Sequence, residues 1–238
     1  MKLERLDKLL ADAGLTRSEA RAAIRNGHVT ADGAVQRDPG VKLPRDAVLA
    51  LRGQPLVSEE YVYYMLHKPA GYVSASMGEG DHPPVTDLLP PDLKKRGLFC
   101  VGRLDADVTG LLLLTDDGAW AHRIASPRSA IPKVYRARTD GPLTPDDAEA
   151  LAHGVTLRSG VTYRPARLQI GAADPACALV TVTEGKFHEV KNLFAARGRR
   201  VLALERLSIG GVRLDPSLSP GEGRRLTSEE KETLTSKC

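Results

Sequence analysis

Apolar positions near the start of the chain recur at helical spacing. Leu6, Leu9, Leu10 and Ala13 would share one face of a helix, and Gly14 ends the pattern. The positions between them are mostly polar or charged, so one side of this segment would be buried and the other exposed. The sequence therefore predicts a short amphipathic helix at this place.

A second amphipathic helix is predicted directly afterwards. Thr16 stands three residues before Glu19, which is the spacing of a capping box, and the helical pattern ends near Gly27. Small apolar residues supply the buried side, and arginines that recur every four positions form a basic stripe on the other side. These two sets are Ala20, Ala23 and Ile24, and Arg17, Arg21 and Arg25.

The pattern then changes to short strands. Two β runs within His28–Val35 are joined by Asp32-Gly33, a strong signal for a tight hairpin, and Val41–Leu51 adds another β-like piece. Gly53–Glu60 is polar, contains a proline and lacks periodicity, which indicates a linker. The expected organisation is a small domain at 1–52, a linker at 53–60 and a second domain at 61–238.

Beyond the linker, short alternating or apolar runs are separated by glycine and proline. There is no long strand–helix alternation and no internal repeat. This pattern predicts an α+β fold with a mainly antiparallel mixed sheet and flanking helices. Strands are expected at 61–66, 98–101, 111–115, 133–139, 155–158, 166–170, 178–183 and 201–209. Helices are expected at 85–89, 119–125, 144–153 and 187–197.

The composition matches an average soluble globular protein, with 42% apolar and 27% charged residues in a chain of 238. A net charge of +4 and a pI near 9.0 fit nucleic-acid binding without requiring it. The three cysteines are widely spaced and form no CxxC motif, so a reducing compartment is expected. No segment has the length of a membrane span, and the amino terminus lacks the apolar core of a signal peptide. We expect a cytoplasmic protein with no membrane partner.

The stretch Gly102–Gly110 holds the most distinctive polar residues. Its two glycines bracket a turn with Arg103, Asp105 and Asp107, and four consecutive leucines follow. Glycine allows a sharp bend or a close backbone approach, and the leucines anchor the turn in a core. A carboxylate held beside an arginine on such a turn stays ionised near neutral pH and is placed to act as a nucleophile. From these residues alone, a surface turn with solvated charges remains equally open.

The first domain resembles the S4 RNA-binding domain. The resemblance rests on Arg5–Gly33 (RLDKLLADAGLTRSEARAAIRNGHVTADG) and continues to about Leu51. It implies that the domain binds RNA through phosphate contacts, which position the protein without reading bases. The residues expected to make these contacts are Arg17, Arg21 and Arg25. The alternative is an exposed charged helix on a generic α+β module.

Four blocks of the second domain together resemble the pseudouridine synthases that modify ribosomal RNA, in the branch with an N-terminal S4 domain. The blocks are Lys68-Pro-Ala-Gly71, GRLDADVTGLLLLTDDG from Gly102, Ser126-Pro-Arg128 with Lys133-Val-Tyr135, and Glu184-Gly-Lys-Phe-His-Glu-Val-Lys191. The HxVK form of the last block and the chain length favour the small-subunit, RsuA-type enzyme, whose target is uridine 516 of 16S rRNA. A 23S rRNA enzyme of the same family is the alternative. The implied reaction detaches a uridine base from its ribose, rotates it and rejoins it by a carbon–carbon bond, and it needs no metal or organic cofactor.

The resemblance also implies roles for individual residues. Asp105 matches the catalytic aspartate, and Tyr135 matches the aromatic residue that stacks on the target base. Lys191 matches the basic residue that pairs with the aspartate, and Arg103 would replace the flipped base or bind a phosphate. Asp107 is expected to hydrogen-bond the amides of its own turn. Further contacts to the RNA are expected from Lys68, Arg128, Lys133 and His188. The implied partner is ribosomal RNA or a ribosomal assembly intermediate, bound by a monomer.

The last block departs from the usual family wording at three positions. Glu189 replaces a common glutamine, Asn192 a common basic residue and Phe187 a common tyrosine. Asn192 removes a positive charge from the expected RNA face, and Glu189 adds a negative charge that could pair with Lys191. These changes leave the expected reaction in place but leave the particular RNA site open.

Two other functions fit parts of the sequence. Asp105-Ala-Asp107-Val-Thr109 also spells DxDxT, the start of a magnesium-dependent phosphatase, although Gly102 and Arg103 interrupt the apolar strand that such an enzyme needs, and its fold would be doubly wound α/β. A non-catalytic S4-type RNA-binding protein is the second alternative, because a fold does not fix a function. The histidines and cysteines show no ligand spacing that would indicate zinc.

Overall fold

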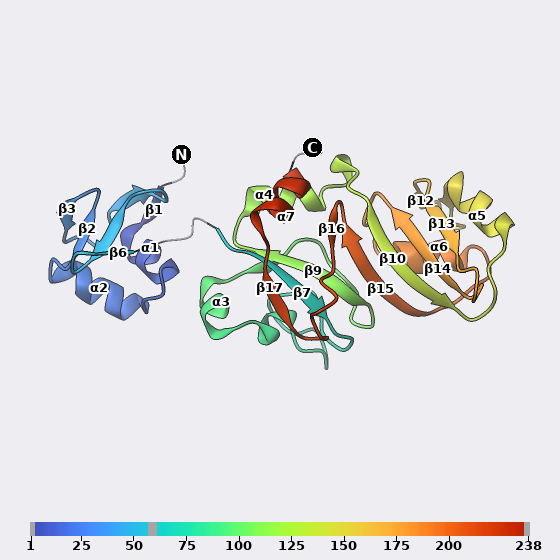
Figure 1. Ribbon diagram of the computed structural model, residues 1–238, viewed down its shortest axis with the longest axis horizontal. Helices are drawn as coiled ribbons and strands as arrows, with labels where there is room; N and C mark the ends of the chain where they lie inside the picture. The colour runs from blue at the N-terminus through green and yellow to red at the C-terminus, as the bar shows by residue number, and fades with distance from the viewer. Residues whose placement is uncertain (1–2, 57–60, 236–238) are drawn as a thin grey trace. The chain divides into compact units, whose positions relative to one another are not determined.

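The computed structural model describes residues 3–56 and 61–235, which belong to two compact units (Figure 1). The first unit contains the chain up to Val62 together with Pro90–Gly97, and the second contains the remainder. Within these described ranges, no helix combines the length and apolarity that crossing a membrane requires.

The first unit begins with the two predicted helices. α1 spans Leu6–Asp12 and α2 spans Arg17–Arg25. The capping box is present as predicted: Glu19 N donates to Thr16 Oγ1, and the Glu19 carboxylate accepts from Thr16 N at 2.7 Å. The buried side of α2 consists of Ala20 and Ile24, which pack with α1 in one apolar cluster. The amphipathic pattern therefore predicted both helices and their shared core.

Short strands complete the first unit. The hairpin at Asp32-Gly33 is confirmed, with φ of +49° and +82° at the two turn residues. The predicted linker is wrong at its start, because β6 pairs with β5 and extends this sheet to Leu56, while residues 57–60 lie outside the described residues. The strands are β1 (Leu3–Arg5), β2 (Val29–Ala31), β3 (Ala34–Gln36), β4 (Lys42–Pro44), β5 (Leu49–Leu51) and β6 (Gln54–Leu56), with β3–β2–β5–β6 in one sheet and β1–β4 in another.

One helix of the first unit was not predicted. α3 spans Pro91–Arg96, far along the chain, and its last residue donates from Nη1 to the carbonyl of Asp12 at 3.3 Å. Gly97 ends it in the left-handed conformation at φ +72°, as is common at helix C-termini. Because α3 has only six residues, it offers too little apolar periodicity to be recognised in the sequence.

The second unit is built on a nine-stranded, mainly antiparallel sheet, which confirms the predicted α+β class. Its central order is β13–β14–β10–β15–β9–β7–β17, and the pairing of β15 with β9 is parallel. The strands of this unit are β7 (Tyr63–Lys68), β8 (Phe99–Cys100), β9 (Thr109–Thr115), β10 (Lys133–Thr139), β11 (Val155–Thr156), β12 (Thr162–Tyr163), β13 (Arg167–Ile170), β14 (Cys177–Val182), β15 (Val201–Ile209), β16 (Val212–Arg213) and β17 (Gly223–Arg225), of which β11 and β12 form a separate pair.

Helices flank this sheet (Figure 1). α4 and α7 contact each other, whereas α5 packs on β13 and α6 contacts β15. α7 lies in a part of the chain for which no element was predicted, and its Leu234 is buried. The helices are α4 (Gly118–Ala125), α5 (Pro145–Ala152), α6 (Glu189–Ala195) and α7 (Ser228–Thr235), with 3₁₀ turns η1 (Val85–Leu88) and η2 (Pro127–Ser129).

The leucine run forms the centre of the sheet. All four residues of Leu111–Leu114 are completely buried, so β9 is covered on both faces. At its start, Gly110 pairs with Arg206 of β15 and has φ +102°. A Cβ atom at Gly110 would lie 2.3 Å from the Arg206 carbonyl oxygen, so only glycine allows this approach. The sheet thereby fixes the end of the turn that carries Asp105.

Candidate active site

A buried lysine holds the turn from Gly102 to Gly110 through hydrogen bonds to backbone carbonyls. Lys68 Nζ donates to three backbone carbonyls, those of Pro69 (3.0 Å), Ala106 (3.2 Å) and Val108 (2.7 Å). Lys68 is 0% exposed, and burial lowers the pKa of its amine to about 8. The prediction that Lys68 contacts RNA is wrong, because its ammonium group lies under the loop. Its position gives it a different task, which is to hold the backbone of Ala106 and Val108, just after Asp105, in place.

A serine fastens the other side of the same turn. Ser74 Oγ donates to the carbonyl of Leu104 at 2.9 Å and accepts from its N–H at 2.9 Å. Gly71 N also donates to the carbonyl of Ala106 at 2.8 Å. Asp105 therefore lies between two tethered neighbours, so its backbone position is fixed by contacts on both sides.

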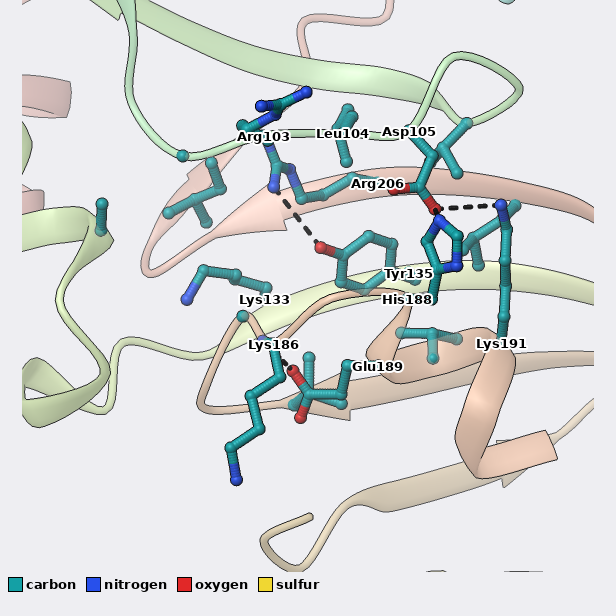
Figure 2. Close-up of a pocket in the computed structure, with 18 of the residues that line it drawn as sticks. Arg103, Leu104, Asp105, Lys133, Tyr135, Lys186, His188, Glu189, Lys191 and Arg206 are labelled. Atoms are coloured by element: carbon teal, nitrogen blue, oxygen red, sulfur yellow. Dashed lines mark hydrogen bonds and ion pairs between the residues drawn. The ribbon is translucent and has the colours of Figure 1, made fainter. Parts of the chain in front are cut away.

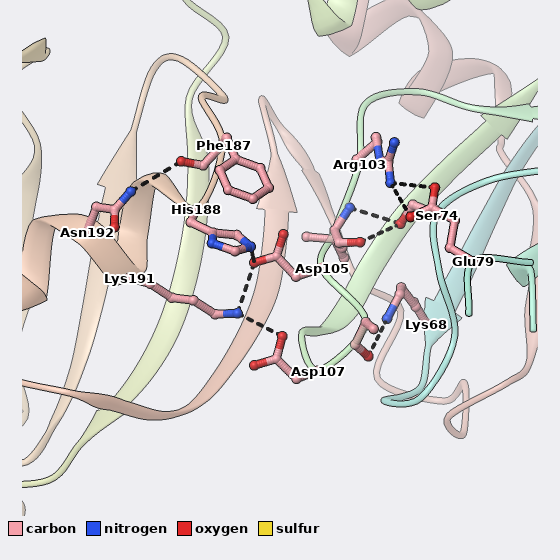
Figure 3. Close-up of polar contacts among 12 residues, drawn as sticks. Lys68, Ser74, Glu79, Arg103, Asp105, Asp107, Phe187, His188, Lys191 and Asn192 are labelled. Atoms are coloured by element: carbon pink, nitrogen blue, oxygen red, sulfur yellow. Dashed lines mark hydrogen bonds and ion pairs between the residues drawn. The ribbon is translucent and has the colours of Figure 1, made fainter. Parts of the chain in front are cut away.

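The carboxylate of Asp105 meets two side chains of the α6 segment (Figure 3). Lys191 Nζ lies 2.9 Å from Asp105 Oδ2, and His188 Nε2 lies 3.5 Å from the same oxygen. The predicted pairing of Lys191 with Asp105 is confirmed. Both side chains of this ion pair are partly buried, which strengthens their attraction relative to a pair on the open surface.

Lys191 is shared with a second carboxylate. Its Nζ donates to Asp107 Oδ1 at 2.7 Å, a contact that the sequence did not predict for Asp107, which was expected to bind the amides of the turn. Although burial opposes the charged forms of both groups, this hydrogen bond raises the pKa of Lys191 and lowers that of Asp107. The ammonium group thus stays charged between two carboxylates of one turn.

Glu189 does not compete for this lysine. Its side chain is buried, and Oε2 accepts from the backbone N–H of Lys186 at 3.2 Å. Burial and the charge of Glu184 raise the pKa of Glu189 to about 7. The possible pairing of Glu189 with Lys191 is therefore not what the structure contains, because Glu189 points into a different part of the pocket (Figure 2).

A pocket opens beside Asp105, and the strands behind it supply two predicted residues (Figure 2). Tyr135 lines it from β10 with its ring largely covered by neighbours. Lys133 lines it two residues earlier, and its Nζ donates to the carbonyls of Ile131 (3.2 Å) and Glu184 (3.1 Å). Burial lowers the pKa of Lys133 to about 8. Lys133 therefore lines the pocket wall, and its predicted contact with the substrate RNA stays a prediction.

Arg206 is a pocket residue that the sequence reasoning missed. It is only 2% exposed, and it donates from Nε to the Leu111 carbonyl (2.8 Å) and from Nη1 to the Tyr135 hydroxyl (3.4 Å). Its Nη2 is buried and has no hydrogen-bond partner within the described ranges. An arginine at an inward position of the predicted strand 201–209 was the available signal, because a charge in a buried strand needs a specific partner.

Two predicted RNA contacts lie outside this pocket wall or at its edge. Arg103 is exposed at the mouth, where its Nη2 lies 2.9 and 3.2 Å from the carboxylate oxygens of Glu79 (Figure 3). Arg128 is exposed in η2 and does not line the pocket. The structure therefore brings Arg103 to the site and leaves Arg128 on the surrounding surface.

The arginine stripe of the first unit lies on α2 as predicted, and all three side chains are exposed. Arg21 also has a structural partner, since its Nε lies 3.0 Å from Asp7 Oδ2. Hydrogen bonds from Arg5 and Arg21 lower the pKa of Asp7 to about 2, against the effect of its burial. Arg17 and Arg25 are therefore the stripe residues that can be tested without disturbing this cluster.

The structure also bears on the phosphatase alternative. A doubly wound phosphatase requires a parallel sheet, whereas this sheet is mainly antiparallel. In the described part of the chain, no group of three His, Cys, Asp or Glu side chains is arranged to hold a metal ion. The phosphatase interpretation of DxDxT is therefore wrong, because the fold belongs to a different class. In addition, the carboxylates of Asp105 and Asp107 are both bound to Lys191.

Comparisons with known proteins agree with this architecture. Residues 4–49 match the S4 domain family, and residues 62–196 match the RNA pseudouridylate synthase family. The ribosomal small subunit pseudouridine synthase A of Vibrio vulnificus (strain CMCP6) is 43% identical over 232 residues, which cover 97% of this chain and 99% of that protein. An uncharacterised RNA pseudouridine synthase of Bacillus subtilis (strain 168) is 39% identical over 97% of this chain and 98% of its own length.

A solved structure agrees over nearly the whole chain. The crystal structure of a pseudouridylate synthase has a TM-score of 0.69 and 39% sequence identity, and the match covers 97% of this chain and 99% of that one. Together with the sheet and the family matches, this likeness extends to both units. The chain belongs to the RNA pseudouridylate synthase family and is a pseudouridine synthase that carries an S4 domain.

Proposed function

We propose that this enzyme converts one uridine of 16S ribosomal RNA to pseudouridine, at the site equivalent to uridine 516. The support is the similarity over almost the whole chain to relatives named as small-subunit pseudouridine synthases. The substrate is the RNA itself or an assembly intermediate of the small subunit. We propose that the enzyme works as a monomer, since one chain supplies all the site residues described above. We also propose that it works in the cytoplasm.

The observation that carries the proposal is the placement of Asp105 at the mouth of the pocket. Its carboxylate is held by Lys191 at 2.9 Å on a turn whose neighbours are tethered to Lys68 and Ser74. A uridine whose base enters the pocket would leave its ribose at the mouth, within reach of this carboxylate. We assign to Asp105 the reaction with the ribose, and to Lys191 the role of keeping that carboxylate charged and oriented.

The pocket wall suits a detached base. Breaking the bond between the ribose carbon and the base nitrogen leaves negative charge on the uracil until the new carbon–carbon bond forms. Lys133 and Arg206 place buried cationic groups around the pocket, and such preorganised charges stabilise developing negative charge. We propose that the unpartnered Arg206 Nη2 donates to a uracil carbonyl while the ring of Tyr135 lies against the base.

The exposed residues have roles outside the pocket. A base must leave its stack to enter the pocket, which costs about a few kcal/mol. Arg103 stands at the mouth and, once released from Glu79, is placed to fill the vacated position in the RNA. Arg17 and Arg25 of the S4 unit are exposed and are proposed to bind phosphates.

Pseudouridine mapping tests this function directly. Unmodified 16S and 23S transcripts, bare and partly assembled with ribosomal proteins, are incubated with the wild-type enzyme and with Asp105→Asn in the presence of a chelator. One new pseudouridine in 16S rRNA from the wild type alone is the expected result. A new pseudouridine only in 23S rRNA would reassign the target. RNA binding by the wild type without any modification would contradict the proposed reaction, and a new pseudouridine from Asp105→Asn would contradict the catalytic role of Asp105.

A further inference from the structure

An aromatic ring stands exposed at the mouth of the active site. Phe187 is 79% exposed, and its ring stacks on that of His188, with 3.7 Å between centroids and 22° between planes (Figure 3). A single exposed apolar side chain is ordinary on a protein surface. This one differs because its partner His188 lies 3.5 Å from the carboxylate of Asp105. The exposed face of the stack therefore adjoins the reacting groups.

The backbone beneath this ring is held in place. The carbonyl of Phe187 accepts from Asn192 Nδ2 (3.4 Å) and from the Tyr163 hydroxyl (3.5 Å), and these two donors are hydrogen-bonded to each other. His188 has φ +52°, an uncommon conformation for a residue other than glycine, and α6 begins at the next residue. Asn192, at a position where a basic residue is common, thus supports the loop on which the ring is displayed.

The ring faces a groove that continues into the catalytic pocket. The groove has a volume of about 610 Å³, and Phe187, Lys186 and Arg103 are among its lining residues. Asp105 and His188 line both the groove and the inner pocket. An occupant of the groove is therefore next to whatever occupies the pocket. If the pocket holds a uridine of an RNA strand, the adjoining space receives a nucleotide bonded to it.

We propose that Phe187 and His188 form a second base-binding subsite, which stacks the unpaired nucleobase next to the target uridine. The inference rests on the proposed function, because it requires the uridine to occupy the inner pocket. Aromatic side chains stack on any base, so the subsite tolerates different sequences. It accepts only a base that is already unstacked from its own helix. The cationic groups of Lys186 and Arg103 lie on the same groove, where the connecting phosphates would pass.

The test compares ring variants on intact and abasic RNA. The substrate is an RNA fragment that contains the target uridine, made intact or with the preceding or the following nucleotide replaced by an abasic one. Pseudouridine formation is measured as kcat/KM for the wild type, Phe187→Ala, Phe187→Leu and Phe187→Tyr. Leu202→Ala is the matched control, because Leu202 is also an exposed apolar residue of this unit and lines neither cavity.

On intact RNA, we expect kcat/KM to fall about 5- to 100-fold in the alanine and leucine variants, as is typical for loss of base stacking. Phe187→Tyr and Leu202→Ala should remain close to the wild type. On one of the two abasic RNAs, the wild type should lose the same factor and Phe187→Ala should lose nothing further. The nucleotide whose removal makes Phe187→Ala equal to the wild type is then the one that stacks on the ring.

Two results would overturn the subsite. One is an unchanged kcat/KM for Phe187→Ala on intact RNA. The other is an equal loss for that variant on intact and on both abasic RNAs, which would place the effect on His188 and Asp105 instead of a base. If the wild type forms no pseudouridine, the proposed function fails. The subsite is then judged separately by fluorescence anisotropy with the same RNAs and variants, where the same pattern of dissociation constants is expected.

Discussion

Glu189 offers a direct test of how burial in the pocket changes the pKa of a carboxyl group and the stability of the fold. It is buried beside Lys186, and burial together with the charge of Glu184 raises its pKa from 4.5 to about 7. The native state therefore keeps the proton at pH values where the unfolded chain has released it. The contribution of Glu189 to the unfolding free energy is therefore largest below pH 4.5. It decreases as the pH rises towards 7 and is constant above that pH.

The replacement Glu189→Gln removes this penalty, since an amide does not ionise and can still accept the hydrogen bond from Lys186. The difference between 4.5 and about 7 corresponds to about 3 kcal/mol at 1.36 kcal/mol per pH unit. The variant should therefore equal the wild type in stability near pH 4.5 and exceed it by about 3 kcal/mol at pH 8. Titrating groups that do not interact with Glu189 are shared by both proteins and cancel in the difference.

Urea unfolding followed by tryptophan fluorescence measures this difference. The chain has one tryptophan, Trp120, which is 2% exposed and lies in the core of the unit that contains Glu189. Unfolding free energies of both proteins are extrapolated to water at pH 5 and at pH 8. Glu149→Gln, on the exposed surface of α5, is the matched control. A stability difference that is the same at both pH values would refute the reasoning.

Three further changes test the site and the RNA-binding unit. Lys68→Met leaves three loop carbonyls without their donor, so we expect a loss of about 1–3 kcal/mol in unfolding free energy by urea titration and a roughly 10- to 100-fold lower kcat. Arg206→Lys keeps the charge but cannot make the same fork of hydrogen bonds, so kcat/KM on the target RNA should fall about 10- to 100-fold without loss of RNA affinity in an anisotropy titration. The double variant Arg17→Ala with Arg25→Ala should weaken RNA binding and reduce the slope of log K against log salt by about 1.4 to 1.8, measured between low and moderate salt. An unchanged stability and kcat for Lys68→Met, an unchanged kcat/KM for Arg206→Lys, or an unchanged salt slope for the double variant would contradict the respective role.

The sequence predicted what is encoded locally or in a contiguous run. The capping box at Thr16 and the Asp32-Gly33 hairpin depend on neighbouring residues, and both are present. The leucine run at Leu111–Leu114 predicted a buried strand, and all four residues are buried in β9. Asp105 and Lys191 were paired through the family resemblance, because they lie 86 positions apart and no local pattern joins them.

The sequence failed where an element depends on a distant partner. β6 contains Pro55, which normally argues against a strand, but β6 lies at an edge of its sheet, where proline is tolerated. β17 consists of Gly223–Arg225 and pairs with β7 near the start of the second unit. Its three residues have no apolar alternation, and a Cβ at Gly223 would lie 2.4 Å from the Met65 carbonyl oxygen. Such a strand forms because of the strands that it pairs with, and its own residues do not indicate it.

The same limit explains why the burial of two lysines was not predicted. The family resemblance implied that Lys68 and Lys133 contact the RNA, and a lysine in a turn or at a strand end is normally exposed, so nothing in the local sequence indicated that they are buried. Each is buried because backbone carbonyls from separate segments converge on its ammonium group. Burial opposes their charge and lowers the pKa of each to about 8, which is a cost to the fold. Lys133 and Arg206 line the pocket beside the turn that carries Asp105. A base that becomes negative during the reaction would be stabilised by these two groups, so the buried charge of Lys133, which is a cost to the fold, is one that the proposed chemistry uses.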